Sequence, residues 1–492
     1  MNETTKYSRL LRNWVSLLGL LLGACALLIG LIMVIIDATQ ENLSAYFGLV
    51  SYLLIPMFAG ACAALVVLGM GLTHWRMKRE GGLPRLPVID LGDRKTVMHI
   101  VLFSLLGAVL VVGGVVVAYR AYHFTESVEF CGTVCHTVMK PEHTAFKQSP
   151  HANTSCAECH IGSGAEWFVK AKISGLYQVY SVLFNKYHRP IETPVQSLRP
   201  AKDTCLACHW PTKFFGAVLR TWTHYGTDEK NSPWTIKMLL NIGGGNPAHG
   251  QIRGIHWHME GVNTVKYIAT DRQRMVIPWV QVTDQSGKVT IYQTEDKKLR
   301  IADGKASSYP QRSMDCIDCH NRPAHTYRSP NELLDMAMAA GRLDSAMPSL
   351  KAVTAKLLAA PYKTEAEALE VMDRDLRVKY PGDERLEGTI RELQAIYCGN
   401  FFPEMKVSWS EYPNHIGHKI TPGCFRCHDG EHVSDSGKRI SKDCNTCHTI
   451  LAQGPGKELA EFTSSGLEFK HPEDIGDDWK TARCDTCHTG SP

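Results

Sequence analysis

The chain has 492 residues, of which 44% are hydrophobic, and a formal net charge of +4. This nearly balanced charge provides no strong basic field, so we expect no nucleic-acid partner. The 17 cysteines and 22 histidines are the informative part of the composition, because their spacing decides their chemistry.

Three apolar runs of membrane-spanning length lie in the first 120 residues. They extend from Trp14 to Ile36, from Tyr46 to Leu72 and from Val97 to Ala118. Each is longer than the roughly 20 residues that a helix needs to cross a bilayer. The first run is too long for a signal peptide and has no clear cleavage site after it, which indicates an uncleaved segment. We therefore predict a three-helix membrane anchor over residues 1–120.

Basic residues around these runs predict the orientation of the anchor. Lysine and arginine precede the first run and fill the connection between the second and third, whereas residues 37–45 contain neither. Because basic loops stay in the cytoplasm, the N-terminus is expected there and everything after Tyr119 outside it.

Seven short motifs of two cysteines and a following histidine occupy the remaining chain. Six have the form Cys-x-x-Cys-His, and the first has one extra residue between its cysteines. In c-type cytochromes the two thiols form thioethers with the haem and the adjacent histidine binds its iron. We predict seven covalently bound c-type haems. The attachment residues would be Cys131, Cys135, Cys156, Cys159, Cys205, Cys208, Cys316, Cys319, Cys424, Cys427, Cys444, Cys447, Cys484 and Cys487, and the iron ligands His136, His160, His209, His320, His428, His448 and His488.

Other uses of these cysteines fit less well. Zinc sites do not require a histidine directly after the second cysteine, and no βαβ pattern typical of a thioredoxin-like dithiol surrounds any motif. The motifs use fourteen of the seventeen cysteines and leave only Cys25, Cys62 and Cys398, so no disulfide framework remains. Haem attachment to reduced thiols indicates a bacterial inner membrane protein whose haem-bearing part lies in the periplasm.

A haem that only transfers electrons needs a second axial ligand, whereas a catalytic haem keeps that position open. Thirteen histidines after Tyr119 lie outside the motifs. His325 and His432 closely follow the fourth and fifth motifs, and His151, His418 (or His415) and His471 precede the second, fifth and seventh. Met139 lies three residues after His136. The predicted second ligands are Met139, His151, His256, His258, His325, His418, His432 and His471.

The expected fold is a mostly α-helical and irregular multihaem cytochrome c. After the anchor we predict a tetrahaem domain over 121–329, with a small β insertion near 260–300 where the composition favours strands. A helical spacer over 330–400 is indicated by capping signals at Ser329-Pro330 and at Thr364 to Glu367. A trihaem domain over 401–492 completes the chain.

Several stretches resemble the NapC/NirT/NrfH family of membrane quinol dehydrogenases over about residues 120–330. They are Glu129 to Met139, Ser149 to Ala152, Cys156 to Ile161, Lys170 to Lys172, and Cys316 to His320 with His325. The resemblance implies a periplasmic tetrahaem domain that oxidises quinol beside the first haem, with Met139 as a ligand and Lys170 or Lys172 as the basic residue. Three spans and seven motifs also resemble the seven-haem ImcH-type subgroup, which passes menaquinol electrons toward extracellular acceptors in anaerobic respiration.

Oxidation of a quinol releases two electrons and two protons, so a polar group must lie near the first haem. Lys172, Lys140, Glu129 and Glu142 are the candidates, and each could equally be an ordinary solvated charge. The predicted function is transfer of electrons from the membrane quinol pool to periplasmic c-type cytochromes or a terminal reductase. Two alternatives remain open: a multihaem reductase of nitrite or hydroxylamine at an open haem, and a relay docked to another quinol-oxidising complex.

Overall fold

The computed structural model describes residues 10–11, 13–39, 55–80, 92–134, 136–162, 165–195, 200–210, 214–243, 254–259, 264–302, 304–459 and 462–491. The chain divides into two units. Unit 1 comprises Met1–Cys131 and Cys156–Tyr180, and unit 2 comprises Gly132–Ser155 and Ser181–Pro492.

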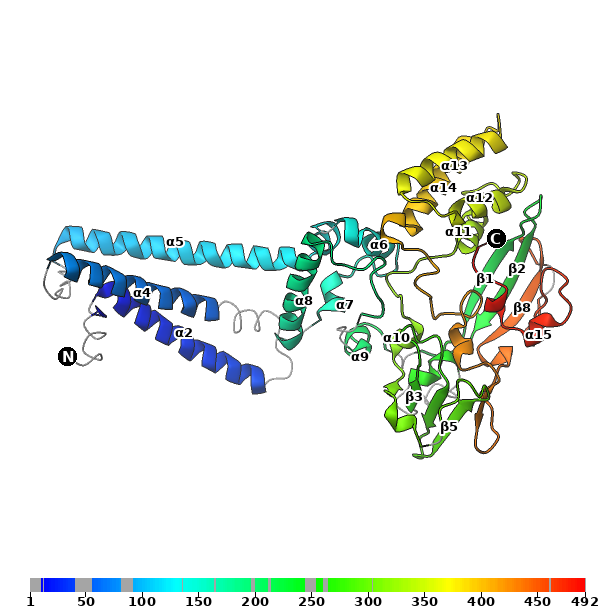
Figure 1. Ribbon diagram of the computed structural model, residues 1–492, viewed down its shortest axis with the longest axis horizontal. Helices are drawn as coiled ribbons and strands as arrows, with labels where there is room; N and C mark the ends of the chain where they lie inside the picture. The colour runs from blue at the N-terminus through cyan, green and yellow to red at the C-terminus, as the bar shows by residue number, and fades with distance from the viewer. Residues whose placement is uncertain are drawn as a thin grey trace. The chain divides into compact units, whose positions relative to one another are not determined.

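Two long apolar helices of unit 1, α2 (Trp14–Thr39) and α4 (Ile55–Glu80), pack against each other (Figure 1). Asn13 Nδ2 donates hydrogen bonds to Thr73 Oγ1 (2.9 Å) and to the carbonyl oxygen of Gly69 (3.1 Å). At Gly19, an added Cβ would lie 2.9 Å from the Cys62 carbonyl oxygen, so the backbones approach closely. Small residues and interhelical hydrogen bonds are the usual basis of helix pairing in lipid.

Among the described residues, two helices are long and apolar enough to cross a membrane, Trp14–Ile35 and Ile55–Arg79. The sequence predicts three such spans, so the prediction is supported for two of them. The third run forms helix α5 (Arg94–Thr125), which begins after Asp93, whose side chain accepts hydrogen bonds from the Lys95 and Thr96 amides. Several side chains of α5 lie outside the described residues. Tyr46 to Leu54 of the predicted second run also lies outside them.

The first motif begins in unit 1 and ends in unit 2, and the second motif lies in unit 1. A π-helical turn spans Phe130–Val134 and is followed by α6 (His136–Lys147). Helix α7 (Cys156–His160) carries the second motif, and α8 (Ala165–Leu183) follows it.

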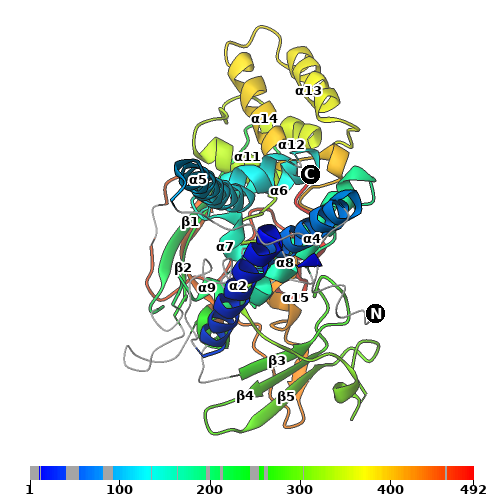
Figure 2. The ribbon, with the colours of Figure 1, turned by 90° about the vertical axis from the view of Figure 1, so that its left-hand side faces the viewer.

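The largest hydrophobic core of unit 2 belongs to four helices that carry no haem motif. Their fully buried side chains include Leu334, Met372 and Leu393. Ser329 caps the first helix by accepting a hydrogen bond from the Glu332 amide. Figure 2 shows the last two helices side by side. The four are α11 (Pro330–Ala339), α12 (Leu350–Ala359), α13 (Glu365–Lys379) and α14 (Leu386–Asn400).

Two antiparallel sheets complete unit 2. The first has the order β1-β2-β8, whose strands are labelled in Figure 1. The second has the order β6-β3-β4-β5-β7, of which Figure 2 labels β3, β4 and β5. Tyr267 pairs with Val280 in the second sheet, and both side chains are buried. The strands are β1 (Val218–Tyr225), β2 (Pro233–Leu240), β3 (Thr264–Ile268), β4 (Trp279–Thr283), β5 (Val289–Thr294), β6 (Arg312–Ser313), β7 (His432–Ser434) and β8 (His448–Pro455).

Each sheet contains one strand from the last 90 residues of the chain. Strand β8 pairs with β2, and β7 pairs with β5, although more than 130 residues separate the partners in each case. The stretches that the sequence predicts as separate tetrahaem and trihaem domains therefore share two hydrogen-bonded sheets. Such long-range pairing leaves no local signal in the sequence.

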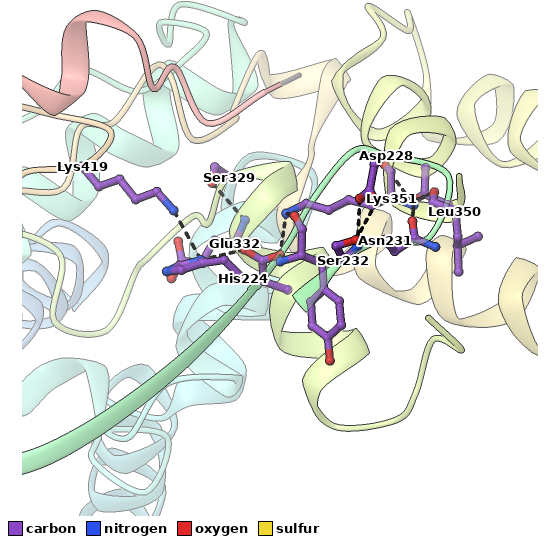
Figure 3. Close-up of polar contacts among 12 residues, drawn as sticks. His224, Asp228, Asn231, Ser232, Ser329, Glu332, Leu350, Lys351 and Lys419 are labelled. Atoms are coloured by element: carbon purple, nitrogen blue, oxygen red, sulfur yellow. Dashed lines mark hydrogen bonds and ion pairs between the residues drawn. The ribbon is translucent and has the colours of Figure 1, made fainter. Parts of the chain in front are cut away.

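A buried polar network joins the helices to the first sheet (Figure 3). Lys351 Nζ donates a hydrogen bond to Asp335 Oδ1 (2.5 Å) and another to the Tyr225 carbonyl oxygen. Asp335 also accepts from the Tyr225 amide (2.9 Å) and from His224 Nδ1 (3.0 Å). Burial alone would raise the pKa of Asp335, but the hydrogen bond from His224 and the charge of Lys351 outweigh it and lower this pKa overall. Asn231 adds hydrogen bonds to the Met347 carbonyl (2.7 Å) and from the Lys351 amide (2.9 Å).

Candidate functional site

Each described motif places its cysteines on a single helical turn. At four motifs the amide of the histidine donates to the carbonyl oxygen of the first cysteine, over 2.8–3.0 Å. Residues three and four positions apart in a helical turn share one face, so the two cysteines and the histidine lie on the same side, as thioether attachment with iron ligation requires. The turns after α7 are α9 (Ala201–Cys205), α10 (Cys316–Cys319), and the 3-10 turns Gly423–Arg426, Cys444–Thr446 and Cys484–Thr486.

Five motif histidines of unit 2 each face a second histidine from elsewhere in the chain. The bond between a metal and an imidazole nitrogen is about 2 Å long, and the centre of the ring lies roughly 1 Å further out. The centres of two imidazole rings that bind one iron from opposite sides are therefore about 6 Å apart. The observed ring-centroid distances fit a haem iron between the rings. They are 6.0 Å for His209 and His151, 6.4 Å for His320 and His256, 5.8 Å for His428 and His258, 6.2 Å for His448 and His418, and 6.0 Å for His488 and His471.

Backbone carbonyls orient several of these second histidines through Nδ1. His256 donates to Ile242 (2.6 Å), and His258 to Ile255 (2.8 Å) in the turn Ile255–Met259. His471 Nδ1 lies 2.9 Å from the Glu473 carbonyl oxygen and 3.2 Å from the Glu473 amide nitrogen. A carbonyl partner at Nδ1 fixes the tautomer that leaves Nε2 as the lone-pair donor, which is how proteins usually hold metal-binding histidines. Burial lowers the pKa of His258 and of His418, which favours the neutral imidazole that iron needs.

His432 does not join such a pair. Its Nδ1 bonds to Asp429 (2.9 Å) and its Nε2 donates to the Ile277 carbonyl (2.7 Å), so both ring nitrogens are engaged. Burial alone would lower its pKa, but the hydrogen bond with Asp429 outweighs burial and raises the pKa overall. This geometry does not support His432 as an iron ligand. Its closeness to His428 in sequence misleads, because β7 directs the ring into the second sheet.

The second ligands of the first two motifs stay predictions. His325 Nδ1 lies 3.0 Å from the Glu142 carbonyl oxygen and 3.1 Å from the Glu142 carboxylate. Met139 lies half-buried on α6. Cys135 and the side chain of His136 lie outside the described residues. His415, the alternative to His418, is buried and bonds to the Asp318 carbonyl (3.1 Å), and burial lowers its pKa to about 4.

Attachment sites of different motifs lie close together. The thiols of Cys131 and Cys156 hydrogen-bond to each other in unit 1, which lowers the pKa of Cys131 to about 7. Cys205 and Cys316 form a similar pair in unit 2. In the later motifs, Cys319 of the fourth lies close enough to Cys424 and Cys427 of the fifth to interact with them electrostatically. Cys424 interacts in the same way with Cys447 of the sixth motif, and Cys444 of the sixth with Cys484 of the seventh. The fourth to seventh attachment sites are thus neighbours in chain order.

Lys172 in α8 lies at the first motif. Its Nζ donates to Glu126 Oε1 (2.5 Å) and lies 3.3 Å from Thr125 Oγ1, at the C-terminal end of α5. Both charges of this pair lie close enough to influence the Cys131 thiol. The Lys172 side chain is 37% exposed and that of Glu126 16%. Glu126 is not among the candidates for the quinol site that the sequence predicts. Its position, five residues before the first motif, is the signal in the sequence that could have identified it.

The other three candidates have different surroundings. Lys140 forms an exposed ion pair with Glu365 in unit 2 (2.7 Å). Glu142 faces His325 and Arg322 in the same unit. Glu129 is exposed in unit 1. The contacts of Lys172 adjoin a haem-attachment cysteine, Cys131. Within the described ranges, no cluster of three or more histidine, cysteine, aspartate or glutamate residues is arranged to hold a bare metal ion.

Apolar anchoring helices, haem-attachment turns and paired histidines together define a membrane-anchored c-type cytochrome of electron transport. Residues 93–202 match the model of the N-terminal region of the NapC/NirT cytochrome c family. The cytochrome c-type protein ImcH of Geobacter sulfurreducens (strain ATCC 51573 / DSM 12127 / PCA) is 41% identical over 495 residues, which cover 97% of this chain and 95% of that protein. The chain belongs to the NapC/NirT cytochrome c family. No solved structure matches it.

Proposed function

We propose that this protein is an inner-membrane cytochrome with seven covalent haems that oxidises menaquinol or a related quinol. Electrons then pass to periplasmic c-type cytochromes or a terminal reductase. The orientation of basic loops supports a multi-pass anchor with α5 as its third span and the haem-bearing part in the periplasm. Family membership and the anchoring helices support the same membrane location.

The fourteen motif cysteines and seven motif histidines would hold the haems. When bound, each haem accepts and donates one electron. His151, His256, His258, His418 and His471 would supply the second ligands of the third, fourth, fifth, sixth and seventh haems. A histidine on both sides leaves no open position for a substrate, which argues against a reductase at these five haems. His325 and Met139 remain the candidates for the first two.

The contact between Lys172 and Glu126 beside Cys131 is the observation that carries the quinol assignment. A quinol must lose two protons as well as two electrons, and its oxygens need a donor and a base within hydrogen-bond reach. Lys172 Nζ is a donor that can hold a quinol oxygen, and the Glu126 carboxylate is a base that can accept a proton. Glu126 directly follows α5, the proposed third span, so the pair lies where the chain would leave the membrane and where a lipid-soluble substrate could reach it.

Substitution of two neighbouring lysines tests this site. Lys172→Ala removes the donor, whereas Lys170→Ala removes a lysine whose ammonium lies over the Trp167 ring, 4.7 Å from its centroid. We expect Lys172→Ala to slow quinol-driven haem reduction by about tenfold or more, and Lys170→Ala to leave it nearly unchanged. Stopped-flow absorbance with a menaquinol analogue measures both, with dithionite reduction as the control. Equal quinol rates in the two variants would remove Lys172 from the site.

A further inference from the structure

Helix α8 presents its apolar side chains to the outside. Val169, Ile173, Leu176 and Leu183 are spaced at helical intervals, with Tyr180 between the last two, so they lie along one face. Ile173 is 64% exposed and Leu176 is 72% exposed. We call this face, Val169, Ile173, Leu176, Tyr180 and Leu183, the α8 stripe.

The opposite face of α8 carries small side chains. Ala171, Ser174 and Gly175 are partly buried, whereas the large apolar side chains of the α8 stripe are exposed. A helix at the surface of a water-soluble protein has the reverse arrangement. Isolated exposed residues, such as Val378 on α13, are common and need no explanation, but a continuous apolar face marks an interaction surface.

We propose that α8 lies in the membrane–water interface with the α8 stripe in contact with lipid. Residues 165–180 of the helix belong to the same unit as the two membrane-length helices. Its Lys172 is hydrogen-bonded to Glu126, directly after the last residue of the apolar helix α5 (Figure 1). These contacts connect α8 to the end of an apolar helix, where a face of exposed apolar side chains can meet lipid.

The residues that flank the stripe fit an interfacial helix. Trp167 stacks with Lys170 at the start of α8, and Tyr177 is 67% exposed beside the stripe. Tryptophan and tyrosine concentrate at the headgroup level of membranes, and lysine at the edge of such a helix attracts anionic lipid. The inference concerns lipid contact alone and does not depend on quinol oxidation.

Photolabelling of the intact, haem-loaded protein tests the proposal. The protein would be reconstituted into phosphatidylcholine and phosphatidylglycerol vesicles that contain a phospholipid with a diazirine in its acyl chain. After irradiation and trypsin digestion, mass spectrometry compares the peptide Ile173–Lys186 with the equally apolar peptide Leu357–Lys363 of the helical core. We expect label in the α8 peptide to exceed the core peptide by about tenfold or more, with α2 as the positive control.

Two variants separate lipid contact from general changes in folding. Ile173→Gln with Leu176→Gln should reduce labelling of α8 severalfold while labelling of α2 stays constant, whereas Val378→Gln should change neither. If the double variant loses haem, the wild-type comparison decides alone. Label in the α8 peptide no higher than in the core peptide would overturn the proposal. So would α8 peptides cross-linked to a second copy of the chain in place of lipid.

Discussion

Helices α11–α14 and the haem-attachment turns of unit 2 are stabilised by different means. The helices enclose a continuous core in which Leu334, Leu350 and Leu393 are fully buried. The turns of the last three motifs contain only three or four residues each. Thioether bonds and iron ligation by the paired histidines would take the place of an apolar core there, as in small metal-dependent domains. The same unit thus combines a self-supporting part and a cofactor-dependent part.

The largest contrast is expected when one haem cannot be attached. Cys424→Ser with Cys427→Ser removes both thioethers of the fifth motif, so His258 and His428 lose the iron between them. We expect residues 401–459 to lose roughly 3 kcal/mol or more of protection, because a bound cofactor stabilises the folded state by its binding free energy. Hydrogen exchange with mass spectrometry measures this. Unchanged exchange there, or equal loss of protection in α11–α14, would contradict the contrast.

The buried Asp335–Lys351 pair should contribute the next largest effect. Asp335→Asn leaves the Lys351 ammonium buried without its countercharge and should destabilise α11 and α12 by about 3–5 kcal/mol. Because the pKa of Asp335 is lowered in the folded state, its stabilising contribution is present above the unfolded pKa of about 4 and is lost as the pH falls through the lower folded value.

Urea unfolding followed by circular dichroism at neutral and acidic pH tests this dependence. The wild type should lose the Asp335 contribution on acidification, and Asp335→Asn should not. Asp335→Leu with Lys351→Met, which removes both charges, should restore much of the stability. The same pH dependence in Asp335→Asn and the wild type would show that this carboxylate is not responsible.

Truncation inside the helical core gives a somewhat smaller effect. Leu393→Ala should destabilise α11–α14 by about 2–5 kcal/mol, because the cavity adds to the lost burial. Val378→Ala, at a side chain that is 77% exposed, is the matched control and should cost little. The haem absorbance should stay the same in both variants, since this core contains no motif. A loss of haem in Leu393→Ala would mean that the two parts are not separable.

Substitution of a predicted second iron ligand should change the stability least, but it should change the haem absorption spectrum clearly. His256→Ala should open one coordination position, so that the reduced protein binds carbon monoxide at one haem. His432→Ala should bind none, since both nitrogens of His432 are engaged by Asp429 and Ile277. Carbon monoxide difference spectra of the two variants provide the measurement. Binding by His432→Ala and not by His256→Ala would reverse our assignment.

Patterns in short stretches of the sequence predicted the features that depend on neighbouring residues alone. The haem motifs depend on five or six adjacent residues, and the caps at Ser329 and Thr364 depend on hydrogen bonds to amides three residues later. Apolar runs likewise predicted α2 and α4. The partners of the histidines could not be found in this way. His151 faces the histidine of the third motif and not the second, which it precedes, because long-range packing decides which imidazoles meet.

The same limit applies to His418, which faces His448 of the sixth motif although it precedes the fifth. The pairing of β2 with β8 joins residues more than 200 positions apart. Glu126 was missed because its role depends on Lys172, which lies 46 residues later on a different helix. In each case two distant segments meet through tertiary packing, which single-sequence patterns do not encode.

Anaerobic mixing of the purified, oxidised protein with a menaquinol analogue is the most direct test of quinol-driven electron transfer. Haem absorbance would be recorded in a stopped-flow instrument, with dithionite as the reference for complete reduction. We expect rapid reduction that inhibitors of quinol sites suppress and that extends beyond a single haem. No reduction by the quinol, with dithionite still effective, would contradict the proposed function and indicate a protein that receives its electrons from another complex.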